Sequence, residues 1–124
     1  MAAFRKFEDI DAWQKARELA NLIYSITDNE IFGNDFAMKN QIRRSALIAM
    51  TSIADGFCRD SNQEFGNCLG QAKGATAETR SLLYVSLDRH YISEENFLKA
   101  SAFATDVERL ASGLMKYLRS GLKS

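Results

Sequence analysis

Apolar residues recur every three or four positions along four stretches of this chain, and none of its 124 residues is a proline. This spacing puts apolar side chains on one side of an α-helix. The absence of proline favours long helices with short connections. The pattern predicts helices over about residues 9–27 and 35–55, a third helix opened by the capping box Ser61–Glu64, and a fourth capped by Ser93 and ended by Gly121.

The seams of the four predicted helices have heptad-like spacing, which is typical of packed helix bundles. We therefore expect an all-α protein, an up-and-down antiparallel four-helix bundle, with residues 1–124 forming a single domain. The predicted core positions are Trp13, Ala16, Ala20, Ile23, Thr27, Met38, Ile42, Ala46, Ala49, Ile53, Phe65, Leu69, Ala72, Thr76, Thr79, Leu83, Leu87, Phe97, Ala100, Ala104, Val107, Ala111, Leu114 and Leu118.

Three of the helices carry a second apolar stripe beside the first. The members of these stripes are Ala12, Leu19 and Ile26; Leu47, Met50, Ala54 and Phe57; and Phe103, Leu110 and Tyr117. Together they exceed what one small bundle is expected to bury. The sequence therefore predicts a homo-oligomer.

Glycines recur at intervals of four inside the predicted third helix, at Gly66, Gly70 and Gly74, and the stripe continues through Ala77 and Ser81. A glycine inside a helix costs about 1 kcal/mol relative to alanine. We expect these glycines to mark a close helix contact, within the chain or at a subunit interface. Gly56 is instead expected to end the second helix as a left-handed cap.

Charge and composition exclude several classes of protein. Sixteen basic residues balance sixteen acidic ones, so the whole chain does not attract nucleic acid or a membrane, and no apolar run approaches the length of a membrane span. No signal peptide is visible at the start, and Cys58 and Cys68 are expected to be free thiols in the cytoplasm. With one histidine and two cysteines, the sequence predicts neither a metal site nor a cofactor.

The middle of the chain carries a combination of motifs: Gln41-Ile42-Arg43-Arg44-Ser45-Ala46, Ser52-Ile53-Ala54-Asp55-Gly56, Arg59-Asp60-Ser61 and Glu64-Phe65, with Trp13-Gln14-Lys15-Ala16 and Ile23-Tyr24 upstream. This combination resembles the bacterial four-helix-bundle family of 23S rRNA intervening-sequence proteins. It is also similar to the accessory variability determinant of diversity-generating retroelements. The resemblance implies an up-down bundle that assembles into a homopentameric ring, without known catalysis, and a nucleic-acid ligand in the retroelement members.

A basic cluster is predicted around the second helix, formed by Lys39, Arg43, Arg44 and Arg59. These side chains are candidates for a patch that contacts phosphates. The alternative is a structural role, in which Arg43 pairs with a carboxylate at a helix interface. The candidate acids are Asp55, Glu64 and Glu78.

Catalytic signatures are missing around the titratable residues. His90 has no evident orienting acid and nucleophile, and neither cysteine has an activating base in its sequence context. Trp13, on a core stripe, is expected to pack rather than to stack on bases. The sequence favours a non-catalytic scaffold or binding module for RNA or a protein partner. The alternative is an enzyme with a pocket at the bundle end or the oligomer axis.

Overall fold

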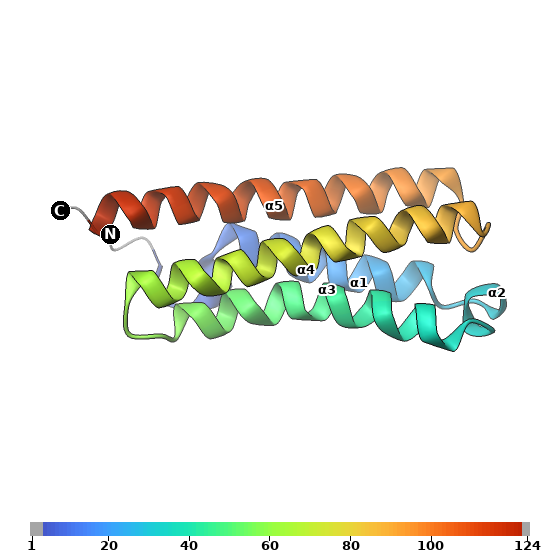
Figure 1. Cartoon of the computed structure of the whole chain (residues 1–124), viewed down its shortest axis with the longest axis horizontal. Coiled ribbons are helices and arrows are strands. Elements are labelled where there is room, and N and C mark those ends of the chain that lie inside the picture. Colours follow the sequence, from blue (N-terminus) through green and yellow to red (C-terminus); the bar gives the residue numbers. More distant parts are fainter. Residues whose placement is uncertain (1–3, 123–124) are drawn as a thin grey trace.

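The computed structural model describes residues 4–122 as helices joined by short turns. Four long helices run up and down along one axis (Figure 1): α1 (Asp11–Ile26), α3 (Phe36–Phe57), α4 (Asn62–Asp88) and α5 (Glu94–Leu122). The predicted all-α four-helix bundle is confirmed. The short elements η1 (Phe7–Asp9) and α2 (Glu30–Gly33) are additional to the prediction.

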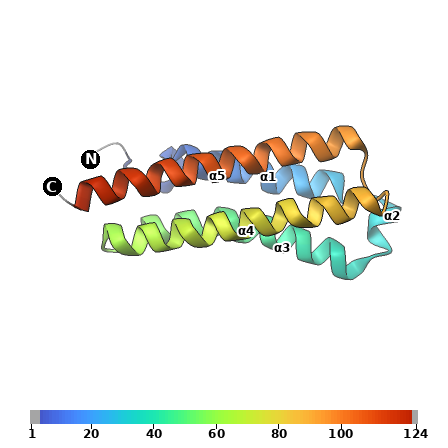
Figure 2. The same ribbon diagram turned by 45° about the horizontal axis from the view of Figure 1, so that its top comes forward.

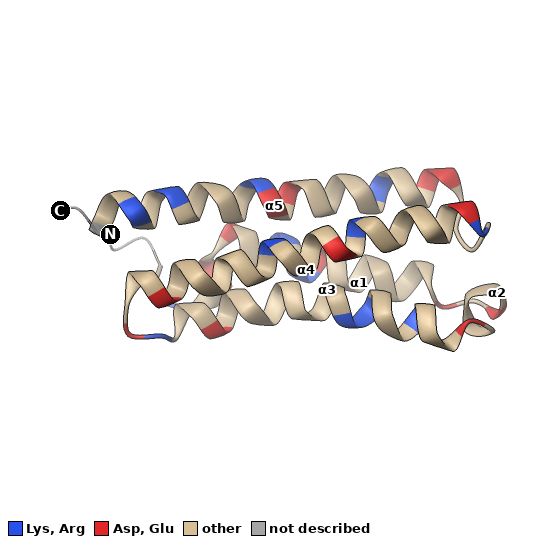
Figure 3. Ribbon diagram, in the orientation of Figure 1, with Lys and Arg blue, Asp and Glu red and all other residues tan. Residues whose placement is uncertain are grey.

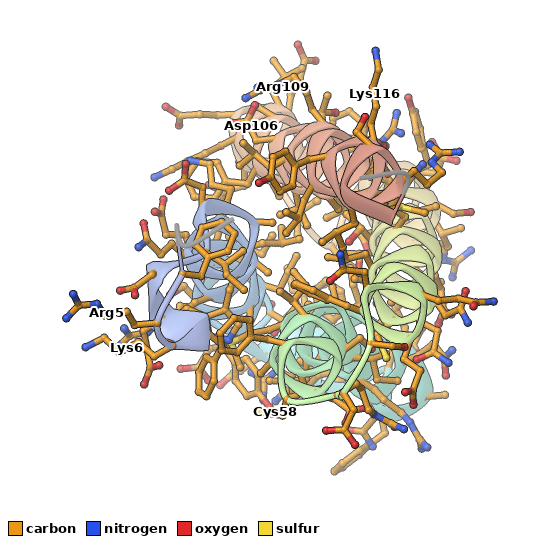
Figure 4. The ribbon with its side chains drawn as sticks, turned by 90° about the vertical axis from the view of Figure 1, so that its left-hand side faces the viewer. Arg5, Lys6, Cys58, Asp106, Arg109 and Lys116 are labelled. Carbon is orange, nitrogen blue, oxygen red and sulfur yellow. The ribbon has the colours of Figure 1, made fainter. Side chains whose placement is uncertain are left out.

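The helices follow one another around the bundle. α3 packs against α4, α4 against α5, and α1 against both α3 and α5, whereas within residues 4–122 no Cα atom of α1 lies within 8 Å of one of α4. Figure 2 shows α5 and α1 as one layer beside α4 and α3, and the end view in Figure 4 places α1 and α4 on opposite sides. The outer sides of α1 and α4 therefore face away from each other.

Side-chain caps fix where the helices begin. The Ser61 hydroxyl accepts a hydrogen bond from the Glu64 backbone N–H at 3.1 Å, and the Ser93 hydroxyl accepts one from Asn96 at 3.1 Å. The Asn29 side chain accepts one from Phe32 at 2.8 Å, which opens α2. Each cap satisfies a backbone donor that the first turn leaves without a partner. The caps at Ser61 and Ser93 are those predicted from the sequence, and Asn29 starts the additional turn α2.

The predicted core positions meet inside the bundle. All are buried except Trp13, Met38, Leu87 and Leu114, which are half-buried and pack against the core. The second stripe of α1 is also buried in the same core, and Leu47, Met50 and Phe57 of the second stripe of α3 pack against it. The premise that these two stripes are left over for another subunit is therefore wrong.

Candidate functional site

Arg43 links α3 to the end of α1. Its Nε donates to the Thr27 hydroxyl at 2.8 Å, an Nη donates to the Tyr24 carbonyl oxygen at 3.3 Å, and the guanidinium lies 4.3 Å from the centre of the Tyr24 ring. Thr27 itself donates to the Ile23 carbonyl oxygen at 2.7 Å. Arg43 thus binds acceptors at the C-terminal end of α1, where a cation is favoured.

The carboxylates suggested for Arg43 have other partners. Within residues 4–122, no acidic side chain lies within 4.0 Å of Arg43. Gln41 donates to Glu78 at 2.6 Å, and Arg59 is paired with both Asp55 and Glu64. The suggested ion pair between Arg43 and a carboxylate is therefore wrong, because Arg43 binds the end of α1 instead of an acid.

Arg59 lies beyond the opposite end of α3. Its Nε and an Nη donate to the two Asp55 carboxylate oxygens at 3.2 and 3.1 Å, and these hydrogen bonds raise the pKa of the guanidinium. A further Nη lies 3.7 Å from Glu64. Since a helix rises about 1.5 Å per residue, Arg59 is about 20 Å from Arg44 along the axis. The basic part of α3 lies in its α2-facing half (Figure 3). The four predicted residues therefore do not form one cluster.

Lys39 and Arg44 are the members of the predicted set that, within residues 4–122, are bound neither to an acid nor to a helix end. Arg44 is exposed and Lys39 is half-buried, and neither has a carboxylate within 4.0 Å in the described part of the chain. Contact with nucleic acid at these positions stays a prediction. It now concerns two cations instead of four.

Within residues 4–122, the glycine stripe of α4 makes no close helix contact. A Cβ added to Gly66 or Gly74 would meet no atom within 4 Å, and one added to Gly70 would meet only the Met115 methyl, at 3.9 Å. The expectation of a close approach within the chain is therefore wrong at all three positions. A subunit interface at Gly66, Gly70 and Gly74 stays a prediction.

Gly56 is the glycine at which two helices come close. It is buried, its φ is negative, and α3 continues past it to Phe57, so it is not the left-handed cap that was expected. A Cβ there would lie 2.6 Å from the Cys68 Cβ and 3.0 Å from a Phe65 ring carbon. The end of α3 lies against the start of α4 because this residue has no side chain.

His90 lies just past the end of α4, where its backbone takes part in the turn that ends the helix. Its φ is 61°, in the left-handed region, and its N–H donates to the Leu87 carbonyl at 3.0 Å. The following residue, Tyr91, donates from its N–H to the Ser86 carbonyl at 2.8 Å. This pair of bonds closes a helix with a left-handed residue just past its end. His90 thus supplies the left-handed position just past the end of α4.

The two cysteines are free thiols, Cys58 exposed and Cys68 buried. The Cys68 sulfur lies 4.0 Å from an Asp55 carboxylate oxygen that also accepts from Arg59. Among the described residues, no group of three histidine, cysteine or acidic side chains is placed to hold a metal ion. No helix in that part of the chain has the length and apolar character needed to cross a membrane.

Trp13 packs against the core, as predicted, and also lies beside a cation. It is half-buried, and the Arg17 guanidinium lies 5.8 Å from its ring centre. The Phe7 ring contacts it edge-on, with 5.1 Å between ring centres. The available sequence signal was the i,i+4 spacing of tryptophan and arginine, which places both side chains on one side of a helix.

Comparison with known proteins agrees with this fold. The crystal structure of a protein of unknown function from the S23 ribosomal protein family of Bacteroides thetaiotaomicron is similar, with a TM-score of 0.78 and 26% identity. The match covers 85% of this chain and 98% of that one. None of the curated proteins matches the chain. The family described as 23S rRNA-intervening sequence protein matches residues 8–113. The chain therefore belongs to the family of 23S rRNA-intervening sequence proteins.

Proposed function

We propose that this protein is a non-catalytic helical bundle whose copies assemble through the outer face of α4. This face is formed by Gly66, Gly70, Gly74, Ala77 and Ser81. The observation that carries the proposal is that the three glycines each cost α4 about 1 kcal/mol relative to alanine, although within residues 4–122 no atom lies closer than 3.9 Å to a Cβ added at any of them.

The absence of charge among these five residues also favours assembly through this face. None of its five residues is charged, and beyond Ser81 the exposed side chains of Tyr84 and Val85 continue it with apolar surface. A flat, small-residue, uncharged helix face allows a second helix to approach closely. The assembly that the resemblance implies is a ring of five copies, and we adopt it as the proposed state.

The experiment is a sedimentation comparison of Gly70→Leu and Gly74→Leu with Gly113→Leu. Gly113 is an exposed glycine of α5 whose added Cβ would also meet nothing within 4 Å. All three variants are expected to fold, because leucine forms helix better than glycine and each site has room. The two α4 variants are expected to lose assembled mass, and Gly113→Leu is expected to keep it. Assembled mass retained by all three would refute the α4 face as the interface.

For the ligand of the assembled protein, we propose RNA. The family name refers to an intervening sequence of 23S rRNA, and the chain has cations without acidic partners. The test is a binding titration with single-stranded RNA at about 50 mM and 200 mM salt, since phosphate contacts weaken steeply over that range. An absence of binding at the lower salt would end the RNA proposal without affecting the assembly proposal.

The enzyme alternative predicts chemistry at the bundle end, where a hollow of about 170 Å³ lies between the α3–α4 turn and α5. Its lining includes Ser61 and Arg59 but neither a histidine nor a cysteine. Ser61 is bound to Glu64 as a helix cap, and Arg59 is paired with Asp55. These groups hold the turn together, and they favour the non-catalytic proposal.

A further inference from the structure

We propose that the outer side of α1 is a binding site for single-stranded RNA, in a groove defined by Trp13, Arg17 and Asn21 of α1 and Lys99 and Phe103 of α5. We call it the α1 groove. The proposal rests on RNA as the ligand in the proposed function, and it assigns that ligand to residues outside the basic part of α3.

Two adjoining hollows form the groove. The larger, about 560 Å³, lies along α1 and reaches Lys99 and Phe103 of α5. The smaller, about 300 Å³, lies between α1 and α3 and reaches Tyr24. Both are lined by Trp13, Arg17 and Asn21, so they adjoin along the outer side of α1. Both hollows are wide open to solvent, and together they extend along the helix.

Cations lie against the aromatic rings of this side. The Lys15 and Lys99 ammonium nitrogens are 4.2 and 5.9 Å from the centre of the Phe103 ring. Arg17 lies over Trp13 and Arg43 over Tyr24. Each cation–ring contact found within residues 4–122 thus includes a residue of α1 or lies on α5, which packs against α1. Rings and cations in alternation are the combination that single-stranded nucleic acid binds, through its bases and its phosphates.

The charge of the groove is positive although the chain is neutral. Glu18 is the acidic residue in its lining, and its carboxylate already has the Lys15 ammonium at 3.3 Å. In the described part of the chain, Arg17 and Lys99 have no carboxylate within 4.0 Å. By contrast, Arg59 and Arg80 elsewhere on the bundle are paired with acids. The groove therefore offers two unpaired cations to phosphates.

The remaining groups favour RNA over an acidic peptide. Asn21 and Gln14 use their amide nitrogens on the backbone, at Arg17 and Glu8 respectively, which leaves their amide oxygens to accept from base edges. An acidic side chain would use the cations alone, whereas a nucleotide would use the cations through its phosphate and the rings through its base. α1 lies opposite α4 (Figure 4), so the groove does not overlap the α4 face.

Trp13 is the sole tryptophan of the chain, so its fluorescence reports on this groove alone. The test is a titration of the full-length protein with an unstructured oligouridylate of about 12 nucleotides at about 50 mM salt. Trp13 emission and the anisotropy of labelled RNA are recorded together. The matched variants are Lys99→Glu and Lys116→Glu, since both are exposed lysines of α5 and Lys116 points away from the bundle (Figure 4).

We expect RNA to quench Trp13, Lys99→Glu to weaken binding about fivefold or more, and Lys116→Glu to change it less than about twofold. If the two variants weaken binding equally and RNA leaves Trp13 emission unchanged, the α1 groove is not the binding site. RNA would then remain the ligand, bound elsewhere on the protein. No binding by the parent protein would overturn both. Tighter binding of polyglutamate than of RNA would assign the groove to an acidic protein partner, and equal affinity for uridine monophosphate would make it a nucleotide site instead.

Discussion

Gly56 tests the packing of the bundle most sharply, through the substitution Gly56→Ala. The added Cβ would lie 2.6 Å from the Cys68 Cβ, 3.0 Å from a Phe65 ring carbon and 3.3 Å from the Phe65 carbonyl oxygen. The first and last of these atoms belong to the α4 backbone or are fixed to it, so α3 and α4 must move apart locally. Overpacking of this kind costs about 2–3 kcal/mol. Alanine returns about 1 kcal/mol through its helix propensity.

The net prediction is a loss of about 1–2 kcal/mol in the free energy of unfolding, measured by urea denaturation followed by circular dichroism. For a chain of this size, about 1 kcal/mol corresponds to a shift of about 3–5 °C in Tm. Gly113→Ala is the control, because its Cβ would meet nothing within 4 Å. It is expected to gain up to about 1 kcal/mol. A gain in Gly56→Ala equal to that in Gly113→Ala would refute the close approach of α3 and α4.

Three further predictions concern helix ends. Replacing His90 by glycine is expected to raise Tm by about 3–5 °C, since its φ of 61° suits glycine, whereas Arg89→Gly, at a φ of −84°, should lower Tm. Arg43→Ala is expected to lower the free energy of unfolding by about 1–2 kcal/mol through its lost hydrogen bonds. Arg44→Ala should change it by no more than about 0.5 kcal/mol. Equal losses of the two variants in urea denaturation would contradict the role of Arg43 at the end of α1. The Met38 N–H, and then the Tyr91 hydroxyl, hold the pKa of Asp35 below its usual value of 3.8. Its contribution to stability is therefore complete above pH 3.8 and is lost as the pH falls through the lower folded pKa. Asp35→Asn should remove that part of the acid dependence in urea denaturation between about pH 5 and 2, and an unchanged profile would contradict it.

The sequence predicted the bundle well because its information is local. The spacing of Ile42, Ala46 and Ile53 specifies one helix face, and the Ser61 capping box specifies where α4 begins. The partners of individual side chains depend instead on how the helices are placed around the bundle. Arg43 binds Thr27 of the preceding helical segment, a contact that no spacing within α3 contains.

The glycines show the same limit. The sequence shows that a glycine inside a helix is unfavourable. Whether a neighbouring element packs closely against that glycine is not visible in the spacing of the helix itself. A Cβ added to Gly56 would meet Cys68 and Phe65 of α4, whereas among residues 4–122 one added to Gly66 or Gly74 would meet no atom within 4 Å. The sequence predicted a helix end at Gly56 and close contacts at the other two, and the packing of α3 on α4 reverses both predictions.

Self-assembly is the central claim, and the mass of the unmodified protein in solution tests it most directly. Light scattering coupled to size-exclusion chromatography, at micromolar concentration, is expected to give about five times the monomer mass of 13.9 kDa, as for a pentameric ring. A mass of 13.9 kDa across the whole accessible concentration range would contradict the claim and leave the outer face of α4 without its proposed partner.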